Sequence, residues 1–331
     1  MAYAENENVM DILDKAEKMI FDISQKRIKN DFIKIGDLLS DTITQIEKLY
    51  DSKDYFTGIQ SGLKNLDNIT SGFQNSDLII IAARPSVGKS SLALNIAEFV
   101  AIELKKPVGI FTLEMSKSQI LLRMLASQSR VDLHKIRTGY LSSKDWTPIL
   151  NAASEISDAP IYIDDTPGIN ILEIRAKARR AVLRYNIELL IIDYLQLITI
   201  TNTRKENRQQ EISEISRFLK SIARELNIPV IALSQLNRKA EERGGEPKLA
   251  DIRESGAIEQ DADVVIFLHR EDNKKKDEDE EESAFKKNIL KYKLIVAKQR
   301  NGPTDSADII FFKNITRFAD AEKHSEIVEH V

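Results

Sequence analysis

Cysteine is absent from the 331 residues of this chain, which excludes a disulfide framework and a thiolate metal site. The four histidines show no spacing typical of metal ligands. No apolar run is long enough to span a bilayer, and the polar, acidic N-terminus does not resemble a secretory signal. From these absences we expect a soluble cytoplasmic protein with no membrane partner.

An excess of charge of one sign is also absent, because 48 Lys and Arg face 52 Asp and Glu, for a net charge of −4. No continuous basic stripe runs along the sequence, which argues against a broad DNA-coating surface. A narrow nucleic-acid site built from a few residues of each subunit remains compatible with this balance.

After residue 58, short apolar runs alternate with helical patterns. Near-continuous apolar strands separated by helices predict an α/β fold with a mostly parallel sheet covered on both faces. The last three runs have no helix between them and predict an antiparallel extension at one edge. A charged block at 271–282 predicts a solvated hairpin loop. The expected strands are 78–82, 108–113, 161–164, 189–193, 230–234, 264–268, 292–297 and 309–312, and the expected helices are about 90–104, 117–129, 171–186 and 207–226.

The first 50 residues follow a different pattern, with apolar residues at helical spacing from Val9 to Ile23 and from Leu39 to Tyr50. Two short amphipathic helices have little core of their own, so they must pack on the main domain or on another copy. We therefore divide the chain into a helical linker, 1–56, and a main domain, 57–331. We predict that the linker docks on a neighbouring subunit.

A phosphate-binding loop is predicted between an apolar strand and a helix, where the chain reads Ala-Arg-Pro-Ser-Val-Gly-Lys-Ser at 83–90. Its backbone N–H groups and the helix N-terminus present positive potential to phosphates. Lys89 adds a charge, and the Ser90 hydroxyl can coordinate Mg²⁺. Ala83 stands where the pattern begins with Gly, so the chain must turn there in a conformation open to Ala. The residues expected to bind nucleotide are Ser86, Val87, Gly88, Lys89, Ser90 and Ser91.

Polar residues end three other predicted strands, at the edge where open parallel sheets bind ligands. Asp193 would hold Mg²⁺ opposite Ser90. Glu114 can orient the water that attacks the γ-phosphate, although it could also cap the following helix. Gln235 is interpreted either as a γ-phosphate sensor or as an ordinary turn residue.

Two further stretches carry candidate phosphate ligands. Lys298 and Arg300 lie two apart on an extended segment, so their side chains point the same way. They could clamp a phosphate, which would belong to a neighbouring subunit if they face outward. The alternative is an ordinary solvated strand end. Arg253 and Gly256 belong to a polar loop that could approach a phosphodiester backbone. That loop has no aromatic residue, so base stacking is not implied, and an ordinary solvated loop is the alternative.

Taken in order, these stretches resemble the DnaB-type replicative DNA helicase family over about residues 10 to 320. Besides the phosphate-binding loop, the similar motifs are Leu-Glu-Met-Ser at 113–116, Ile-Asp-Tyr-Leu-Gln at 192–196, Asn-Arg-Gln-Gln-Glu-Ile-Ser at 207–213, Leu-Ser-Gln-Leu-Asn-Arg at 233–238, the run from 251 to 263, and Ala-Lys-Gln-Arg-Asn-Gly-Pro at 297–303.

The resemblance implies a RecA-like P-loop NTPase motor domain that forms a hexameric ring around single-stranded DNA. It implies hydrolysis of ATP or another NTP, with Mg²⁺, at subunit interfaces. By position, Arg300 would be an arginine finger acting on the next subunit and Lys298 its companion. The DNA-tracking loop would contain Arg253, Glu254 and Gly256.

The resemblance also implies partner proteins, namely a helicase loader and primase. The family's N-terminal helical domain, which contacts primase, has no counterpart in these residues, which puts the primase contact in doubt. Two other functions share the same core. A RecA-type recombination or repair ATPase would form filaments, and the run 253–260 together with Arg300 disfavours it. A loader that uses nucleotide only as an assembly switch is disfavoured by Glu114.

Overall fold

The computed structural model describes residues 34–52, 56–198, 208–237, 243–252, 256–271 and 288–321. The chain divides into two units, 1–54 and 55–331. The amphipathic run from Val9 to Ile23 and the charged block at 272–282 lie outside the described residues.

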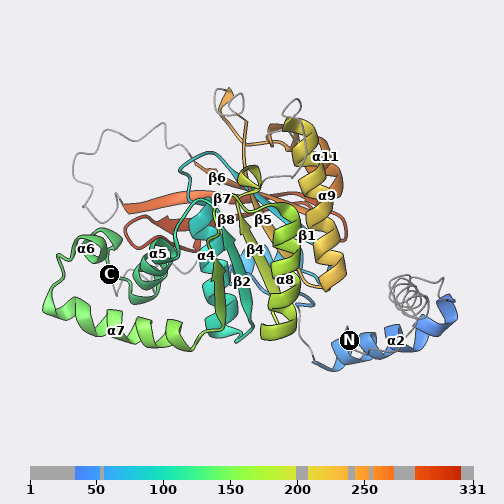
Figure 1. Ribbon diagram of the computed structural model, residues 1–331, viewed down its shortest axis with the longest axis horizontal. Coiled ribbons are helices and arrows are strands. Elements are labelled where there is room, and N and C mark those ends of the chain that lie inside the picture. Colours follow the sequence, from blue (N-terminus) through green and yellow to red (C-terminus); the bar gives the residue numbers. More distant parts are fainter. Residues whose placement is uncertain are drawn as a thin grey trace, which may run out of the picture. The chain divides into compact units, whose positions relative to one another are not determined.

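A single nine-stranded sheet organises the larger unit, in the order β3-β2-β4-β5-β1-β6-β7-β8-β9 (Figure 1). The six strands from β3 to β6 are parallel, and β7, β8 and β9 continue the sheet in antiparallel fashion. This confirms the mostly parallel sheet with an antiparallel edge. The strands are β1 (Leu78–Ala83), β2 (Val108–Thr112), β3 (Ile161–Asp164), β4 (Leu189–Asp193), β5 (Val230–Gln235), β6 (Val264–Arg270), β7 (Ile289–Gln299), β8 (Ser306–Phe312) and β9 (Arg317–Asp320).

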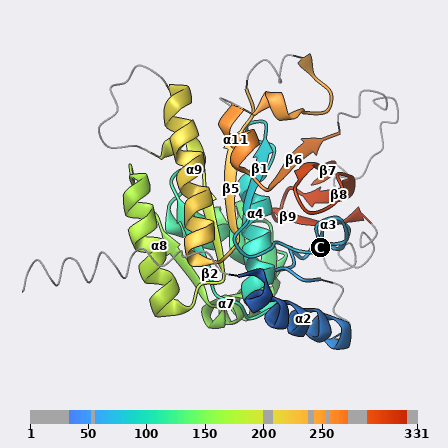
Figure 2. The same cartoon turned by 90° about the vertical axis from the view of Figure 1, so that its right-hand side faces the viewer.

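Helices cover both faces of this sheet. Side chains alternate along a strand, so Ile79 and Ile81 of β1 join one core while Leu78 and Ile80 join the other. The first core is completed by helices α4 and α5, and the second by α8 and α9, which lie side by side (Figure 2). Among the described residues of this unit, the α-helices are α3 (Lys64–Thr70), α4 (Lys89–Glu98) with a π-helical continuation (Phe99–Glu103), α5 (Lys117–Ser129), α6 (Leu133–Thr138), α7 (Ser143–Asp158), α8 (Ile171–Tyr185), α9 (Arg208–Leu226) and α11 (Gly256–Asp261).

The strand register determines which residues meet at each edge of the sheet. At the carboxyl ends of the parallel strands, Ala83 of β1 lies between Gln235 of β5 and Leu268 of β6. At the opposite edge, Gln299 at the end of β7 lies beside Val264 at the start of β6. The phosphate-binding loop therefore lies at the carboxyl ends of the parallel strands, which we call the carboxyl edge of the sheet. The Lys298–Arg300 segment lies at their amino ends, which we call the amino edge.

The smaller unit contains α2 (Ile35–Ser52), which begins before the predicted Leu39. Among the side chains of α2 that the structure describes, the large apolar ones are exposed, and they are Ile35, Leu38, Leu39, Ile43, Ile46 and Tyr50. Within the described ranges, no helix has the length and apolar character that crossing a membrane requires.

Candidate nucleotide-binding site

The turn from β1 into α4 has the geometry of a phosphate-binding loop. Ser86 and Gly88 both have positive φ, of 61° and 101°. An L side chain at Gly88 would be strained at this φ, and its Cβ would also come within 3.3 Å of the Phe318 ring, so the position favours glycine. Ala83, by contrast, is the last residue of β1 and is buried between two strands. Because this position is still strand, alanine fits where the sequence pattern led us to expect glycine.

Lys89 and Asp193 face each other at the floor of this loop. Their Nζ and Oδ1 atoms are 3.8 Å apart, and both side chains are more than nine-tenths buried. Within the part of the chain that the structure describes, neither atom has a hydrogen-bond partner, and the Lys89 ammonium lies 4.5 Å from the centre of the Tyr194 ring. Burial lowers the pKa of Lys89, against the opposing effect of Asp193 and Glu114. A buried cation and carboxylate with unfilled hydrogen-bonding capacity suit a nucleotide phosphate and its Mg²⁺.

Glu114 reaches the same region from the end of β2. The Leu113 N–H donates to the Asp193 carbonyl at 2.7 Å, and the Thr112 hydroxyl donates to the Met115 carbonyl at 2.7 Å. These bonds fix the turn that presents Glu114. A capping box between Ser116 and Gln119 then starts α5, so the capping role falls to Ser116 and leaves the Glu114 carboxylate available.

Arg123 is a residue of this site that the sequence analysis missed. Its Nη1 group donates to the Ser91 hydroxyl at 3.2 Å. Burial lowers its pKa, while Asp193 and Glu114 oppose that shift. Arg123 lies on α5 between the buried Ile120 and Met124. A cation on the buried face of an otherwise amphipathic helix was the signal that could have identified it.

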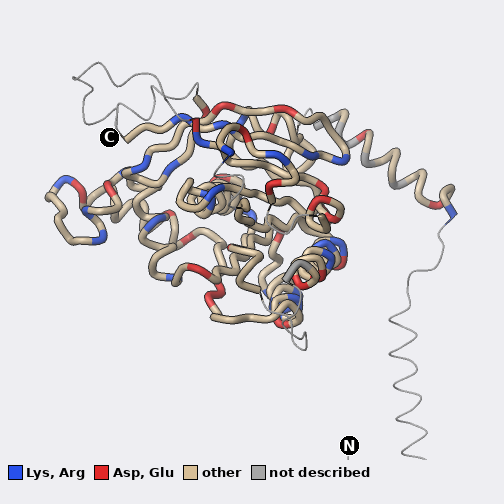
Figure 3. The backbone as a smooth tube through the Cα atoms, turned by 90° about the horizontal axis from the view of Figure 1, so that it is seen from above, with Lys and Arg blue, Asp and Glu red and all other residues tan. Residues whose placement is uncertain are grey.

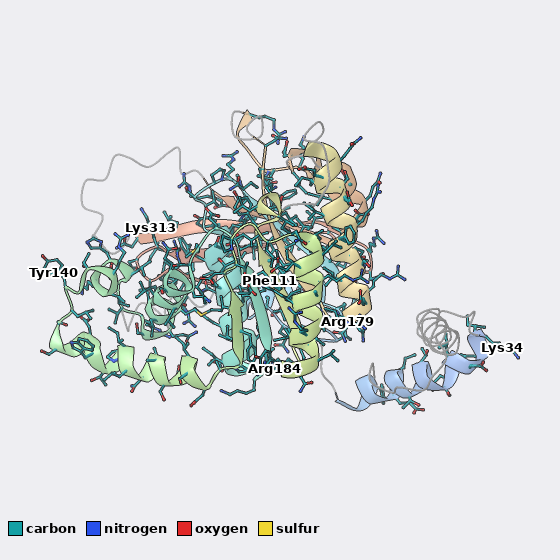
Figure 4. The ribbon with its side chains drawn as sticks, viewed as in Figure 1. Lys34, Phe111, Tyr140, Arg179, Arg184 and Lys313 are labelled. Carbon is teal, nitrogen blue, oxygen red and sulfur yellow. The ribbon has the colours of Figure 1, made fainter. Side chains whose placement is uncertain are left out.

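These residues line a cleft of about 570 Å³ at the carboxyl edge of the sheet. Gln235, the last residue of β5, is half-buried in its wall. The cleft continues past the phosphate-binding loop to Tyr292, Phe311 and Lys313, of which Lys313 is labelled in Figure 4. The structure therefore brings together Ser86, Gly88, Lys89, Ser90, Ser91, Glu114 and Gln235, with Val87 in the same loop and Asp193 beneath it.

Lys298 and Arg300 are not brought to this cleft. The Lys298 ammonium donates to the carbonyls of Glu259 at 2.5 Å and Ala262 at 2.6 Å, and Arg300 Nη2 donates to the Gln260 carbonyl at 2.6 Å. Both cations therefore lie against the end of α11, at the edge opposite the phosphate-binding loop.

Two of the three candidate DNA ligands, Arg253 and Glu254, lie outside the described residues. Gly256 is exposed, and it begins α11 instead of continuing the predicted loop. This short helix forms because Ile258 is fully buried in the α8–α9 core. Basic and acidic residues are interspersed along the described chain (Figure 3), in keeping with its balanced composition.

Comparisons with known proteins agree with this geometry. Residues 58–320 match the model of the DnaB-like helicase C-terminal domain. The chain is 47% identical over 322 residues to the replicative DNA helicase DnaC of Bacillus subtilis (strain 168), covering 97% of this chain and 69% of that protein. It is also 47% identical over 324 residues to the replicative DNA helicase DnaB of Geobacillus stearothermophilus, with the same coverage.

Two solved structures are similar in fold and sequence. One, described as an ATPase domain, has a TM-score of 0.77 and 35% identity, covering 88% of this chain and 99% of that chain. A DnaB-like replicative helicase, described with its interactions with primase, has a TM-score of 0.74 and 33% identity, covering 92% and 71%. A KaiC-like protein from Pyrococcus horikoshii OT3, at 17% identity and a TM-score of 0.55, shares the fold.

Proposed function

Because the chain belongs to the DnaB-like replicative DNA helicase family, we propose that it hydrolyses ATP, or another NTP, at subunit interfaces. Hydrolysis would drive movement along single-stranded DNA and unwinding of the duplex ahead. The observation that carries this proposal is the cleft in which Lys89, Asp193 and Glu114 converge on a phosphate-binding loop.

In this cleft the loop N–H groups from Ser86 to Ser91 would hold the phosphates, with Lys89 at the β- and γ-phosphates. Ser90 and Asp193 would hold Mg²⁺, which supplies neutralisation of phosphate charge when bound. Glu114 would orient the attacking water and accept its proton. Gln235, at the end of the neighbouring strand, would contact the γ-phosphate.

The cleft would be completed by a second copy of the chain. Arg300, with Lys298 beside it, lies at the far edge of the sheet from its own phosphate-binding loop, so we assign it to the γ-phosphate of the next subunit. A hexameric ring, typical of this family, repeats that contact around a central strand of DNA. Arg253, Glu254 and Gly256 would follow the DNA backbone without choosing its sequence.

Residues 1–56 would act as the linker between neighbouring subunits. The exposed apolar face of α2 supports this role, because an apolar stripe of that length requires a packing partner.

We further propose the cytoplasm as the location and a helicase loader as a partner. We also propose primase as a partner, because one similar structure is a DnaB-like replicative helicase described with its interactions with primase, and this chain covers 71% of it.

Unwinding of a forked DNA duplex, measured beside the mass of the assembly, tests the proposed function. We expect Lys89→Ala to lose hydrolysis and unwinding, because the charge at the transferred phosphoryl group is removed. We expect Glu114→Gln to bind nucleotide normally but to turn over at least about 10²-fold more slowly.

Lys144→Ala, which removes an exposed lysine of α7, is the matched control and should behave as the unaltered chain. Normal turnover by Glu114→Gln would remove Glu114 from the water-activating role. Vigorous hydrolysis with no unwinding by the unaltered chain would overturn the helicase assignment.

A further inference from the structure

A buried carboxylate, Asp263, organises the amino edge of the sheet beside Arg300. Asp263 stands between α11 and β6 and is only 4% exposed. Its Oδ2 atom accepts from the Lys220 ammonium at 2.5 Å and from the Leu78 N–H at 2.8 Å. Its Oδ1 atom faces Arg300 Nε at 3.5 Å. The carboxylate is therefore held from one side by α9 and β1, and it offers its other oxygen to Arg300.

The end of α11 supplies the second half of this arrangement. The Gln260 carbonyl accepts from Arg300 Nη2, and three carbonyls, of Glu259, Gln260 and Ala262, accept from the Lys298 ammonium at 2.5, 3.4 and 2.6 Å. The carboxyl end of a helix attracts cations because its last carbonyls lack intrahelical partners. Among the described residues, Arg300 Nη1 makes no hydrogen bond, so these contacts leave part of the guanidinium free for another ligand.

We infer that Asp263 and the carboxyl end of α11 form a positioning site for Arg300, and that α11 links the position of this arginine to the proposed DNA loop. The inference rests on the proposed function, in which Arg300 acts on the next subunit. The link follows from the chain itself, because α11 begins at Gly256, which only Ser255 separates from Arg253 and Glu254. Figure 1 shows α11 beside α9, the helix that carries Lys220.

The physical need for such a site comes from the length of the arginine side chain. An unrestrained arginine must lose rotamer freedom each time it engages a phosphate, and a displacement of about 1 Å can cost about 10²-fold in rate. Asp263 cannot swing with Arg300, because Lys220 and the Leu78 N–H hold it. A shift of α11 would therefore be passed to the guanidinium through the Gln260 carbonyl.

The test is Asp263→Asn, which keeps an acceptor for the Leu78 N–H but removes the charge facing Arg300. We expect kcat for hydrolysis to fall about 10- to 100-fold, with KM for ATP unchanged because the phosphate-binding loop is untouched. We expect stimulation by single-stranded DNA to be lost. Adding Arg300→Ala should cause no further loss beyond that of Arg300→Ala alone, because one residue acts through the other.

Subunit mixing separates a positioning role from a structural one. Asp263→Asn chains have an intact phosphate-binding loop, and Lys89→Ala chains have an intact Arg300. Mixed assemblies, confirmed by mass, should therefore regain activity. The same mixing with Arg300→Ala tests the proposed function itself. Recovery with Arg300→Ala but not with Asp263→Asn would overturn the positioning role alone, and no recovery with Arg300→Ala would overturn the action across subunits.

Two variants guard the test against misfolding. Glu188→Gln breaks the half-buried Lys106–Glu188 ion pair, which does not contact Arg300, and should leave kcat unchanged. If Asp263→Asn does not fold because Lys220 loses its nearer carboxylate and is left with Asp77 at 4.0 Å, Asp263→Asn combined with Lys220→Met removes the Lys220–Asp263 charge pair, and the same kcat loss is expected. Normal kcat in a folded Asp263→Asn chain, with or without Lys220→Met, would contradict the inference, and so would strictly additive losses with Arg300→Ala.

Discussion

At the scale of single residues, Glu98 at the end of α4 is a carboxylate enclosed by the protein, 2% exposed. Its Oε2 atom accepts from Ser127 Oγ at 2.7 Å, Gln128 Nε2 at 3.1 Å and Asn95 Nδ2 at 3.5 Å. Burial nevertheless raises the pKa of Glu98 to about 7, because these bonds and the nearby Arg317 only partly offset the loss of solvation. Glu98 is therefore a source of pH-dependent stability.

We predict that the unaltered chain loses stability relative to Glu98→Gln as the pH rises from about 5 to about 8. The folded chain binds the Glu98 proton more tightly than the unfolded chain, whose glutamate has the ordinary pKa of 4.5. The free energy of unfolding therefore falls with rising pH between these values, by about 3 kcal/mol in all. Thermal unfolding of both proteins across this range measures the difference.

Glu103→Gln is the matched control, because Glu103 is exposed and lines the same cavity as Glu98. Its unfolding temperature should follow that of the unaltered chain at every pH. A constant difference between Glu98→Gln and the unaltered chain from pH 5 to pH 8 would mean that Glu98 does not titrate in this range.

The residues of the nucleotide cleft show what a sequence can predict at this scale. The sequence could predict three of them, because Asp193 ends a strand, Glu114 comes just after one, and Lys89 follows the loop after another. Parallel strands bring their carboxyl ends together at one edge of the sheet. Arg123 comes from the middle of a helix, so its place depended on how α5 packs on α4. The contacts of Arg300 with Asp263 depended on the register of β7 against β6, which periodicity does not give.

At the scale of elements, the eight predicted strands are all present, because each is a short apolar run, fully buried in strands such as β1, β2 and β4 and half-buried in β3. The missed elements are short or polar. Strand β9 has four residues, and α11 has six, with one fully buried side chain, Ile258. Helix α7 contains Pro148, and only Ile149 and Ala152 along it are buried. The secondary structure of such segments depends on tertiary contacts, which the local sequence pattern does not reveal.

The exposed face of α2 yields a prediction at this scale. We expect Ile43→Glu combined with Ile46→Glu to weaken the assembly, because two charges would have to be buried wherever the apolar stripe docks. The unfolding temperature of the larger unit should not change. Analytical ultracentrifugation measures the assembly, and calorimetry measures the unfolding.

Thr44→Glu is the control for this prediction, since Thr44 lies on the other side of α2 from Ile43 and Ile46 at 100° per residue. It should assemble as the unaltered chain does. Full assembly of the Ile43→Glu, Ile46→Glu variant would show that the stripe does not contribute to contacts between subunits.

At the scale of the whole molecule, the proposed site is split between two copies, so hydrolysis must depend on concentration. We predict that the rate of hydrolysis per chain falls on dilution, in step with the loss of assemblies seen by mass photometry. The α2 variant should show the same fall at higher protein concentration. A rate per chain that stays constant where only monomers remain would show that one chain completes its own site.

The placement of the phosphate-binding loop and Arg300 at opposite edges of one sheet also determines how a defective copy behaves. Contacts that join unlike faces are head-to-tail, and a two-fold dimer cannot make them. In such an array a chain lacking Arg300 still holds and hydrolyses its own nucleotide, yet it silences the neighbour that depends on it. The loss of hydrolysis therefore falls on the adjacent copy. A chain lacking Arg300, expressed beside the normal chain, should have a dominant-negative effect.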